Sequence, residues 1–135
     1  METQPNSKAM HIALWAAQGL LAAMFLLSGP MKVAMSTAQL AEMLPWATSV
    51  PAGLVKFIGL SELLGGLGLV LPAALRIKPG LTAWAALGIA AIMLLAIPFH
   101  ISRGETPMIG MNIALMLLAA FVAWGRWKAS PILAK

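Results

Sequence analysis

One carboxylate, Glu62, lies inside an apolar run of residues 54–72 that is long enough to cross a lipid bilayer. An ionised side chain at that depth costs at least about 3 kcal/mol, so the acid needs a cationic partner, a water-lined cavity or a proton. A carboxyl that exchanges a proton can act as a general acid or base, whereas a permanently paired one can be purely structural. Both interpretations of Glu62 stay open at this point.

Three more polar residues accompany the other apolar runs: Lys32 follows the end of the first, His100 lies at the end of the third, and Asn112 lies inside the fourth. Because successive spans run in opposite directions, all four polar residues fall in the same half of a bundle. Ammonium and amide groups donate hydrogen bonds to a ligand carbonyl, and His100 and Glu62 can move a proton. We predict Glu62 and His100 as catalytic residues, with Lys32 and Asn112 as substrate contacts. Alternatively, Lys32 only snorkels, His100 caps a helix end and Asn112 joins helices.

Glycines share the helix face of Glu62. At 100° per residue, Gly59, Gly65 and Gly66 lie within about 60° of Glu62. Glycine lets a neighbouring backbone come close, so this face should look into the bundle and not into lipid. We therefore predict that Glu62 pairs with Lys32, His100 or Asn112, and that Gly59 and Gly66 border the substrate.

The composition is that of an integral membrane protein. The chain is 61% hydrophobic and 10% charged, with a mean hydropathy of +0.90, whereas soluble domains carry about 25% charged residues. We expect a single transmembrane domain over residues 1–135, with the bilayer as its surroundings. The absence of cysteine excludes disulfides and iron–sulfur ligation by this chain, and one histidine with one acid predicts no metal site. The net charge of +5 is spread over loops and ends, which argues against nucleic acid as a partner.

Four spans are expected, over residues 11–29, 54–72, 81–101 and 107–124. Ser28-Gly29-Pro30 should end the first span and Pro72 the second, and Pro98 should disturb the last turn of the third. The first run could also be a signal peptide, but its length favours a retained span. Short connections predict an all-α fold, an antiparallel four-helix bundle.

A short amphipathic helix is expected between spans one and two, within residues 34–44. Ser36 or Thr37 would cap it, Pro45 would stop it, and Trp46 would anchor it at the headgroup level. We expect it to lie at the interface or to fold over the mouth of the bundle.

Basic residues predict the orientation. One side of the bundle carries three of them and the other carries six, which are Lys8, Arg76, Lys78, Arg126, Lys128 and Lys135. The positive-inside rule then places both termini in the cytoplasm, in a multi-pass protein of the inner (plasma) membrane.

Four motifs follow one another along the chain: SGPMK at residues 28–32, FIGLSELLGGLGLVLP at 57–72, a histidine that ends the third span, and an asparagine followed by an apolar run to WGR at 124–126. Together they resemble the DoxX-like family of small four-helix membrane proteins. Members of the wider group are associated with redox complexes, including a quinone-reducing thiosulfate oxidoreductase. The resemblance thus implies a redox-associated accessory subunit, with quinone as the candidate ligand and a redox protein as the candidate partner.

Other functions stay open. The chain could itself be a small membrane enzyme or carrier for an apolar substrate that uses Glu62 and His100 in acid–base chemistry or a proton relay. It could also be a scaffold without a ligand. Small residues on several spans would also permit a homo-oligomer. The sequence contains no phosphate-binding loop, dinucleotide fingerprint or nucleophile elbow.

Overall fold

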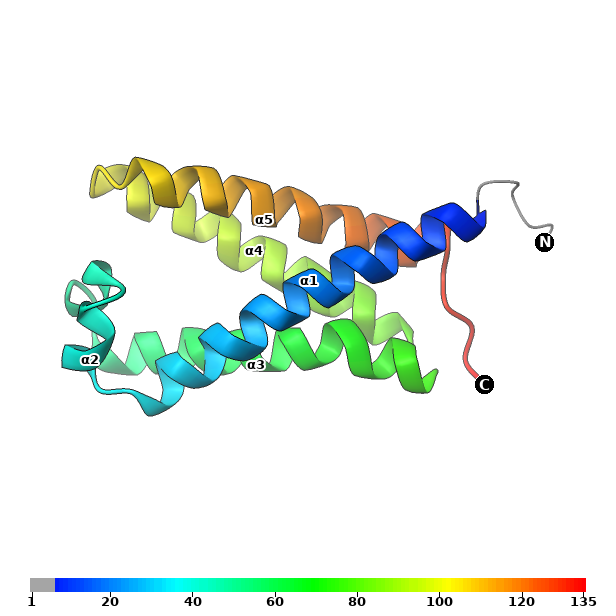
Figure 1. The fold of residues 1–135 in the computed structure, drawn as a ribbon, viewed down its shortest axis with the longest axis horizontal. Coiled ribbons are helices and arrows are strands. Elements are labelled where there is room, and N and C mark those ends of the chain that lie inside the picture. Colours follow the sequence, from blue (N-terminus) through cyan, green and yellow to red (C-terminus); the bar gives the residue numbers. More distant parts are fainter. Residues whose placement is uncertain (1–6) are drawn as a thin grey trace.

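The structure, a computed structural model, describes residues 7–135, so the first six residues of the expected domain lie outside the described part. Its long helices are α1 (Ser7–Ala34), α3 (Ala52–Leu75), α4 (Gly80–Ser102) and α5 (Thr106–Trp124). These segments are apolar and long enough to cross a membrane, the last of them when extended to Ala129. Successive long helices run in opposite directions (Figure 1), which confirms the predicted antiparallel four-helix membrane bundle.

Two prolines that we expected to end helices lie inside them. Pro30 lies within α1 and Pro72 within α3, so both spans are longer than predicted. Proline removes the donor for the carbonyl four residues earlier, which for Pro72 is the carbonyl of Gly68. Thr82 Oγ1 of α4 donates to that oxygen at 3.0 Å. The neighbouring helix thus replaces the lost bond, and α3 continues for another turn.

The third predicted break also lies inside a helix. Pro98 falls within α4, which continues to Ser102. His100, two residues later, is buried with 4% of its surface exposed, as expected for a residue that turns toward the bundle.

Glycines set the crossing of α1 over α3 (Figure 1). A Cβ atom on Gly29 would lie 2.7 Å from the Gly59 carbonyl oxygen, and a Cβ on Gly59 would lie 2.7 Å from that of Gly29. Gly66 packs against Leu26 of α1, and Gly65 packs against Ile89 of α4. The prediction that other helices approach this face of α3 is confirmed.

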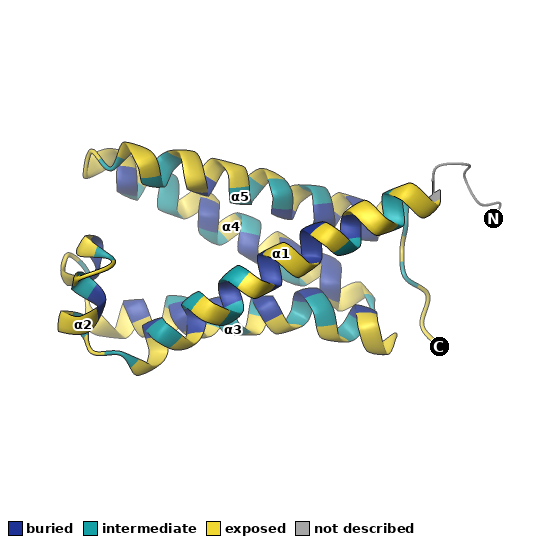
Figure 2. Ribbon diagram, in the orientation of Figure 1, coloured by how far each residue is buried: buried dark blue, intermediate teal, exposed yellow. Residues whose placement is uncertain are grey.

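The bundle consists of two helix pairs. α1 packs on α3, α4 packs on α5, and the pairs meet mainly through α3 and α4. The pairs diverge toward the end that carries α2 (Figure 1), here called the α2 end; the opposite end, with residue 7, residue 135 and the α3–α4 loop, is the terminal end. Exposed positions cover the outside of the bundle (Figure 2) and include Leu27, Phe57 and Leu95, as expected for a lipid-facing surface.

The connection between α1 and α3 folds over the open end of the bundle. Ser36 caps the short helix α2 (Thr37–Ala41) in a capping box with Gln39, and a 3-10 turn, η1 (Pro45–Thr48), follows. The helix is shorter than predicted and ends at Ala41. Pro45 therefore does not end α2 but begins the next turn. Trp46 is only 7% exposed and packs with Leu40, Ala47 and Val55. The expectation that Trp46 anchors at the headgroup level is therefore wrong: its indole is part of a small apolar core.

Candidate functional site

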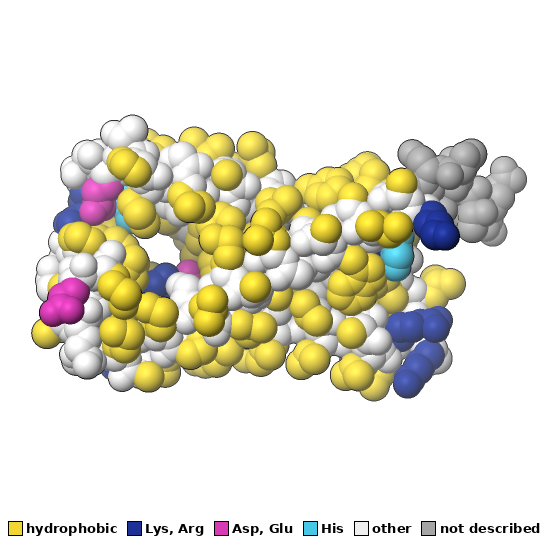
Figure 3. All heavy atoms as spheres, in the orientation of Figure 1, with side chains coloured by type: hydrophobic (Ala, Val, Ile, Leu, Met, Phe, Trp, Pro, Cys, Tyr) yellow, Lys and Arg dark blue, Asp and Glu magenta, His cyan; other side chains and the backbone are white. Residues whose placement is uncertain are grey.

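A cavity of about 520 Å³ lies at the α2 end, where the two helix pairs diverge. Most of its wall is apolar and comes from all four long helices and from the α2–η1 segment. Figure 3 shows an opening between the pairs at this end, with basic and acidic side chains inside it. Phe57, Leu95 and Met111 line the cavity and are also more than half exposed on the lipid-facing surface, so the cavity opens sideways toward the bilayer. The polar residues of its wall are Ser28, Lys32, Trp46, Ser61, Glu62, His100 and Asn112.

Glu62 is paired with Lys32. Lys32 Nζ donates to both carboxylate oxygens, at 2.9 and 3.0 Å, and Ser28 Oγ donates to Oε1 at 2.9 Å. Glu62 is 2% exposed and Lys32 is 8% exposed. The prediction that Glu62 pairs with Lys32, His100 or Asn112 is confirmed for Lys32, and the pair satisfies the requirement that a charge at membrane depth has a partner.

The glycine crossing positions this ion pair. A Cβ on Gly59 would lie 2.6 Å from the Cβ of Lys32, so the lysine stem lies directly on the glycine surface of α3. Glu62 follows Gly59 by three residues and therefore lies one turn further along the same face. Ser28 precedes Lys32 by one turn on α1, which brings its hydroxyl to the same carboxylate.

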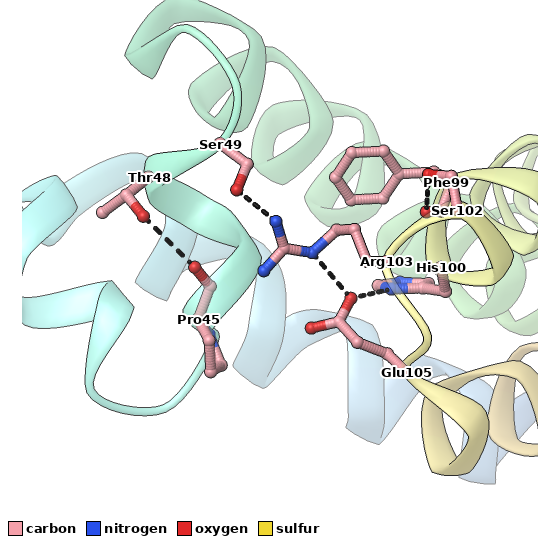
Figure 4. A network of polar contacts seen from close by, with 8 residues as sticks. All are labelled: Pro45, Thr48, Ser49, Phe99, His100, Ser102, Arg103 and Glu105. Atoms are coloured by element: carbon pink, nitrogen blue, oxygen red, sulfur yellow. Dashed lines mark hydrogen bonds and ion pairs between the residues drawn. The ribbon is translucent and has the colours of Figure 1, made fainter.

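His100 bonds to Glu105 and not to Glu62. Its Nδ1 lies 2.8 Å from Glu105 Oε1, and Arg103 Nε donates to the same oxygen at 2.9 Å. Figure 4 shows Arg103 between this carboxylate and Ser49, to whose hydroxyl its guanidinium also donates. The hydrogen bond with His100, and secondly that with Arg103, holds the pKa of the Glu105 carboxyl below its ordinary value. This network ties the segment over the cavity to the loop between α4 and α5.

Two donors in the cavity wall have no hydrogen-bond partner among the described residues. They are Trp46 Nε1 and Asn112 Nδ2, and both side chains are more than nine-tenths buried. Buried polar groups are nearly always hydrogen-bonded, so an orphaned pair in one cavity calls for an explanation. Both residues line the cavity, but the two nitrogens themselves are buried behind its surface, so an acceptor in this space reaches them only after a small rotation of the two side chains.

Four of the six predicted site residues line this one cavity: Glu62, His100, Lys32 and Asn112. Trp46 lies between two of them, with its ring centroid 5.6 Å from Lys32 Nζ and 6.2 Å from the His100 ring. Gly59 and Gly66 are in helix contacts and are not part of the cavity wall. Their role in substrate binding stays a prediction, while their role in packing is shown.

Sequence reasoning missed three residues of the site. Ser28 could have been found, because its spacing of four from Lys32 places both on one face of α1. Glu105 had a weaker signal, an acid in a loop five residues after His100. Nothing local indicates Trp46 as a wall residue, since its burial depends on the α2–η1 segment folding back onto α3.

A second polar cluster lies at the terminal end. Arg126, one of the six basic residues that set the predicted orientation, is 4% exposed and lies within a π-helical turn, η2 (Gly125–Ala129), that prolongs α5. Its Nε donates to Gln18 Oε1 at 2.6 Å, and Gln18 Nε2 donates to the Leu69 carbonyl at 2.6 Å. These buried acceptors hold the guanidinium inside the bundle, a position that its place in the count of basic residues did not indicate.

The donor set around the cavity suits an organic ligand better than a metal ion. Residues 7–135 contain no group of three histidine, cysteine or acidic side chains placed to hold a metal. The residues that line the cavity instead include two with unpartnered N–H donors, together with an imidazole and an ion pair in an apolar wall. Such a site can bind, orient and exchange a proton with an apolar molecule that carries carbonyl or hydroxyl groups.

Comparison with known proteins agrees with this architecture. The sequence pattern of the DoxX-like family matches residues 16–122, which run from within α1 to within α5 and include all four polar residues of the predicted site. No curated protein and no solved structure gives a significant match. The match extends over well more than half of the chain and agrees with four apolar helices, so this protein belongs to the DoxX-like family of membrane proteins.

Proposed function

We propose that this protein binds a lipophilic molecule with hydrogen-bond acceptors, of the quinone type, in the cavity at the α2 end, as an accessory subunit of a membrane redox system. The single observation that carries the proposal is the pair of buried, unpartnered donors, Trp46 Nε1 and Asn112 Nδ2, in the wall of one mainly apolar cavity. A quinone ring carries two carbonyl acceptors and an apolar tail, which fits such a wall.

The cavity has a suitable size and shape for the ring. Its volume of about 520 Å³ lies within the usual range for small-molecule sites. The opening beside Phe57 and Leu95 leaves room for a tail to extend into the lipid. When bound, a quinone would supply two-electron redox chemistry, while the residues of this chain would orient the ring and handle protons.

His100 and Glu62 would have different roles. His100 Nδ1 is bonded to Glu105, so its other ring nitrogen, Nε2, is the atom that can exchange a proton with a ligand. Both oxygens of Glu62 are bonded to Lys32, and one also to Ser28. This pair would fix the electrostatic potential at the cavity wall and so help to orient polar groups of the ligand.

A binding experiment with matched variants tests the proposal. A short-chain benzoquinone is titrated into the purified protein in detergent micelles, and bound quinone is measured by equilibrium dialysis. Trp46→Phe and Asn112→Leu each remove one donor and should weaken binding by about 2- to 10-fold, as expected for one hydrogen bond. Ser61→Ala is the control, because Ser61 lines the cavity but its hydroxyl already donates to the Phe57 carbonyl at 2.9 Å. Equal affinity in all variants would refute the binding site.

The His100–Glu105 contact favours a second candidate function, a small membrane enzyme or carrier that moves protons. An imidazole held by a carboxylate at 2.8 Å is a common arrangement for general acid–base work. Turnover by the isolated chain, lost in His100→Gln and retained in Trp46→Phe, would favour this function over that of an accessory subunit. Co-purification with a redox protein would favour the accessory subunit.

Localisation in the inner (plasma) membrane with both termini in the cytoplasm is part of the same proposal. Six basic residues lie at the terminal end or in its loops and three at the α2 end, and the positive-inside rule then places the terminal end in the cytoplasm. The cavity would thus open in the outer half of the bilayer.

A further inference from the structure

A buried cation at the terminal end has no acidic partner among residues 7–135. Arg126 donates to Gln18 Oε1, to His11 Nδ1 at 3.0 Å and to the Ser130 carbonyl at 2.9 Å, which are all neutral acceptors. The ion pairs of the described residues all involve Glu62 or Glu105, at the other end. The positive charge of Arg126 is therefore hydrogen-bonded but not compensated within the described chain.

This cation fixes the hydrogen-bonding role of His11. Arginine has no acceptor, so His11 Nδ1 must be the acceptor in its contact with Arg126, and the ring proton is on Nε2. His11 is also in the wall of a second cavity, of about 410 Å³. The Nε2–H group is thus a donor for a ligand in that cavity, and Arg126 behind the ring favours a negatively charged ligand.

A second cation borders the same cavity. Arg76, in the α3–α4 loop, uses its Nε to donate to the Leu133 carbonyl at 2.8 Å, which leaves its two terminal amino groups for a ligand. The Lys135 amide donates in turn to the Arg76 carbonyl at 3.1 Å. The C-terminal residues thereby form one wall of the cavity and hold Arg76 beside it.

The rest of the cavity wall is apolar and lies at the boundary of the spans. Trp15, Ala73, Ile132 and Leu133 contribute to it, where α1 begins and α3 ends. Figure 3 shows basic side chains and a histidine grouped at this end, with acidic side chains at the opposite end. The described acidic residues all belong to the α2 end: Glu42 to the α1–α3 connection, Glu62 to the ion pair and Glu105 to the α4–α5 loop.

We infer that the terminal-end cavity is a binding site for the phosphate headgroup of an anionic phospholipid. The phosphate would accept from Arg76 and from His11 Nε2, and an acyl chain would lie along Trp15 and Ile132. A free phosphate shares the charge chemistry but has no use for the apolar wall, so the lipid is the better fit. This site is separate from the cavity at the α2 end and does not depend on the function proposed for it.

Lipid competition on the full-length protein tests this inference. The purified chain is exchanged into nanodiscs that contain phosphatidylcholine and phosphatidylglycerol with identical acyl chains, then released into detergent, and the retained lipid is identified by native mass spectrometry. Wild-type protein should retain phosphatidylglycerol in preference to phosphatidylcholine, with one molecule bound per chain. No preference would overturn the site.

Two variants distinguish a site formed by specific residues from a general attraction of anionic lipid to a basic surface. Loss of any surface charge lowers affinity for anionic lipid by about fivefold, wherever that charge lies. Arg76→Gln should lower the preference by more than this. Lys128→Gln removes an exposed charge of the same end that is not part of the cavity wall, and it should lower the preference by about fivefold or less. Equal losses in the two variants would overturn the inference.

A further experiment distinguishes a phospholipid headgroup from inorganic phosphate as the ligand. Inorganic phosphate at millimolar concentration should not displace the retained phosphatidylglycerol from wild-type protein. Displacement would show that the cavity selects the anion alone, and the lipid assignment would be wrong. Arg76→Lys keeps the charge and should retain most of the lipid preference that Arg76→Gln loses. That result would show that Arg76→Gln loses the preference through its missing charge and not through misfolding.

Discussion

Lys32 and Glu62 neutralise each other across two helices, in a region where both side chains are at least nine-tenths buried. Such a pair is costly to form but more costly to break, because removal of one partner leaves the other charge buried. Ser28 adds a third contact on the same carboxylate. At the scale of single residues, this ion pair and the neighbouring free donors of Trp46 and Asn112 give the cavity its chemical character.

The ion pair should be strongly coupled in stability. Glu62→Gln leaves the Lys32 ammonium without a counter-charge, so the free energy of unfolding should fall by about 3 kcal/mol or more. The double variant Lys32→Met with Glu62→Gln should be less destabilised than the sum of the two single variants. Reversible unfolding in mixed detergent micelles measures all four free energies, and additivity of the single effects would contradict a direct pair.

The Glu105 network should give the protein a dependence on acidic pH. Because hydrogen bonds from His100 and Arg103 lower the pKa of Glu105 in the folded protein, its stabilising contribution is present above the ordinary pKa of 4.5. That contribution is lost as the pH falls through the lowered pKa. The difference in melting temperature between wild type and Glu105→Gln should therefore shrink below about pH 4.5. Glu42→Gln, at an exposed acid of the same end, should show no such trend.

At the scale of elements, the helices continue where the sequence alone suggests that they stop. The carbonyl of Gly68, freed by Pro72, is served by Thr82 from the start of the next helix. This hydrogen bond between α4 and α3 allows α3 to continue past Pro72. Because α3 extends to Leu75, Arg76 reaches the terminal end.

This explanation can be tested by a pair of substitutions. Thr82→Val removes the substitute donor and should lower the free energy of unfolding by about 1 kcal/mol. In a Pro72→Ala background the helix has its own amide donor for Gly68, so the same Thr82→Val change should cost clearly less. Unfolding measurements on the four proteins decide, and an equal cost in both backgrounds would contradict the proposed role of Thr82.

Sequence reasoning was sufficient for the spans and for the gathering of polar residues, because length, apolarity and alternating direction determine both. It also placed the partner of Glu62 among three candidates, of which the structure selects Lys32, where glycines let the two helices approach. It failed where contacts between residues far apart in the sequence determine the structure. The continuation of α3 depends on Thr82, the burial of Trp46 depends on a segment folding back, and the inward position of Arg126 depends on Gln18, which lies 108 residues earlier.

At the scale of the whole molecule, charge is divided between two ends with different chemistry. The α2 end holds ion pairs and free donors around an apolar cavity, while the terminal end holds basic groups with a buried arginine. The helix pairs diverge at the α2 end and pack closely at the terminal end. This asymmetry fits a protein with a fixed orientation across the bilayer.

The orientation predicts the result of a reporter experiment. A fusion after Lys135 and an insertion at Gly104, in the α4–α5 loop, should report opposite sides of the membrane, with Lys135 in the cytoplasm. Gly104 suits an insertion because it lies in an exposed loop and has no neighbouring atom within 4 Å of where a Cβ would lie. Reporters on the same side would contradict the four-span topology.

The sideways opening of the cavity changes what affinity means for this protein. A molecule that arrives through the gap beside Phe57 and Leu95 comes from the acyl-chain region and exchanges places with lipid tails. Occupancy would then follow the mole fraction of the ligand in the bilayer, and its concentration in water would matter only through partitioning. Two ligands with the same contacts but different tails would fill the site to different extents, and dilution with extra lipid would empty it at constant total ligand.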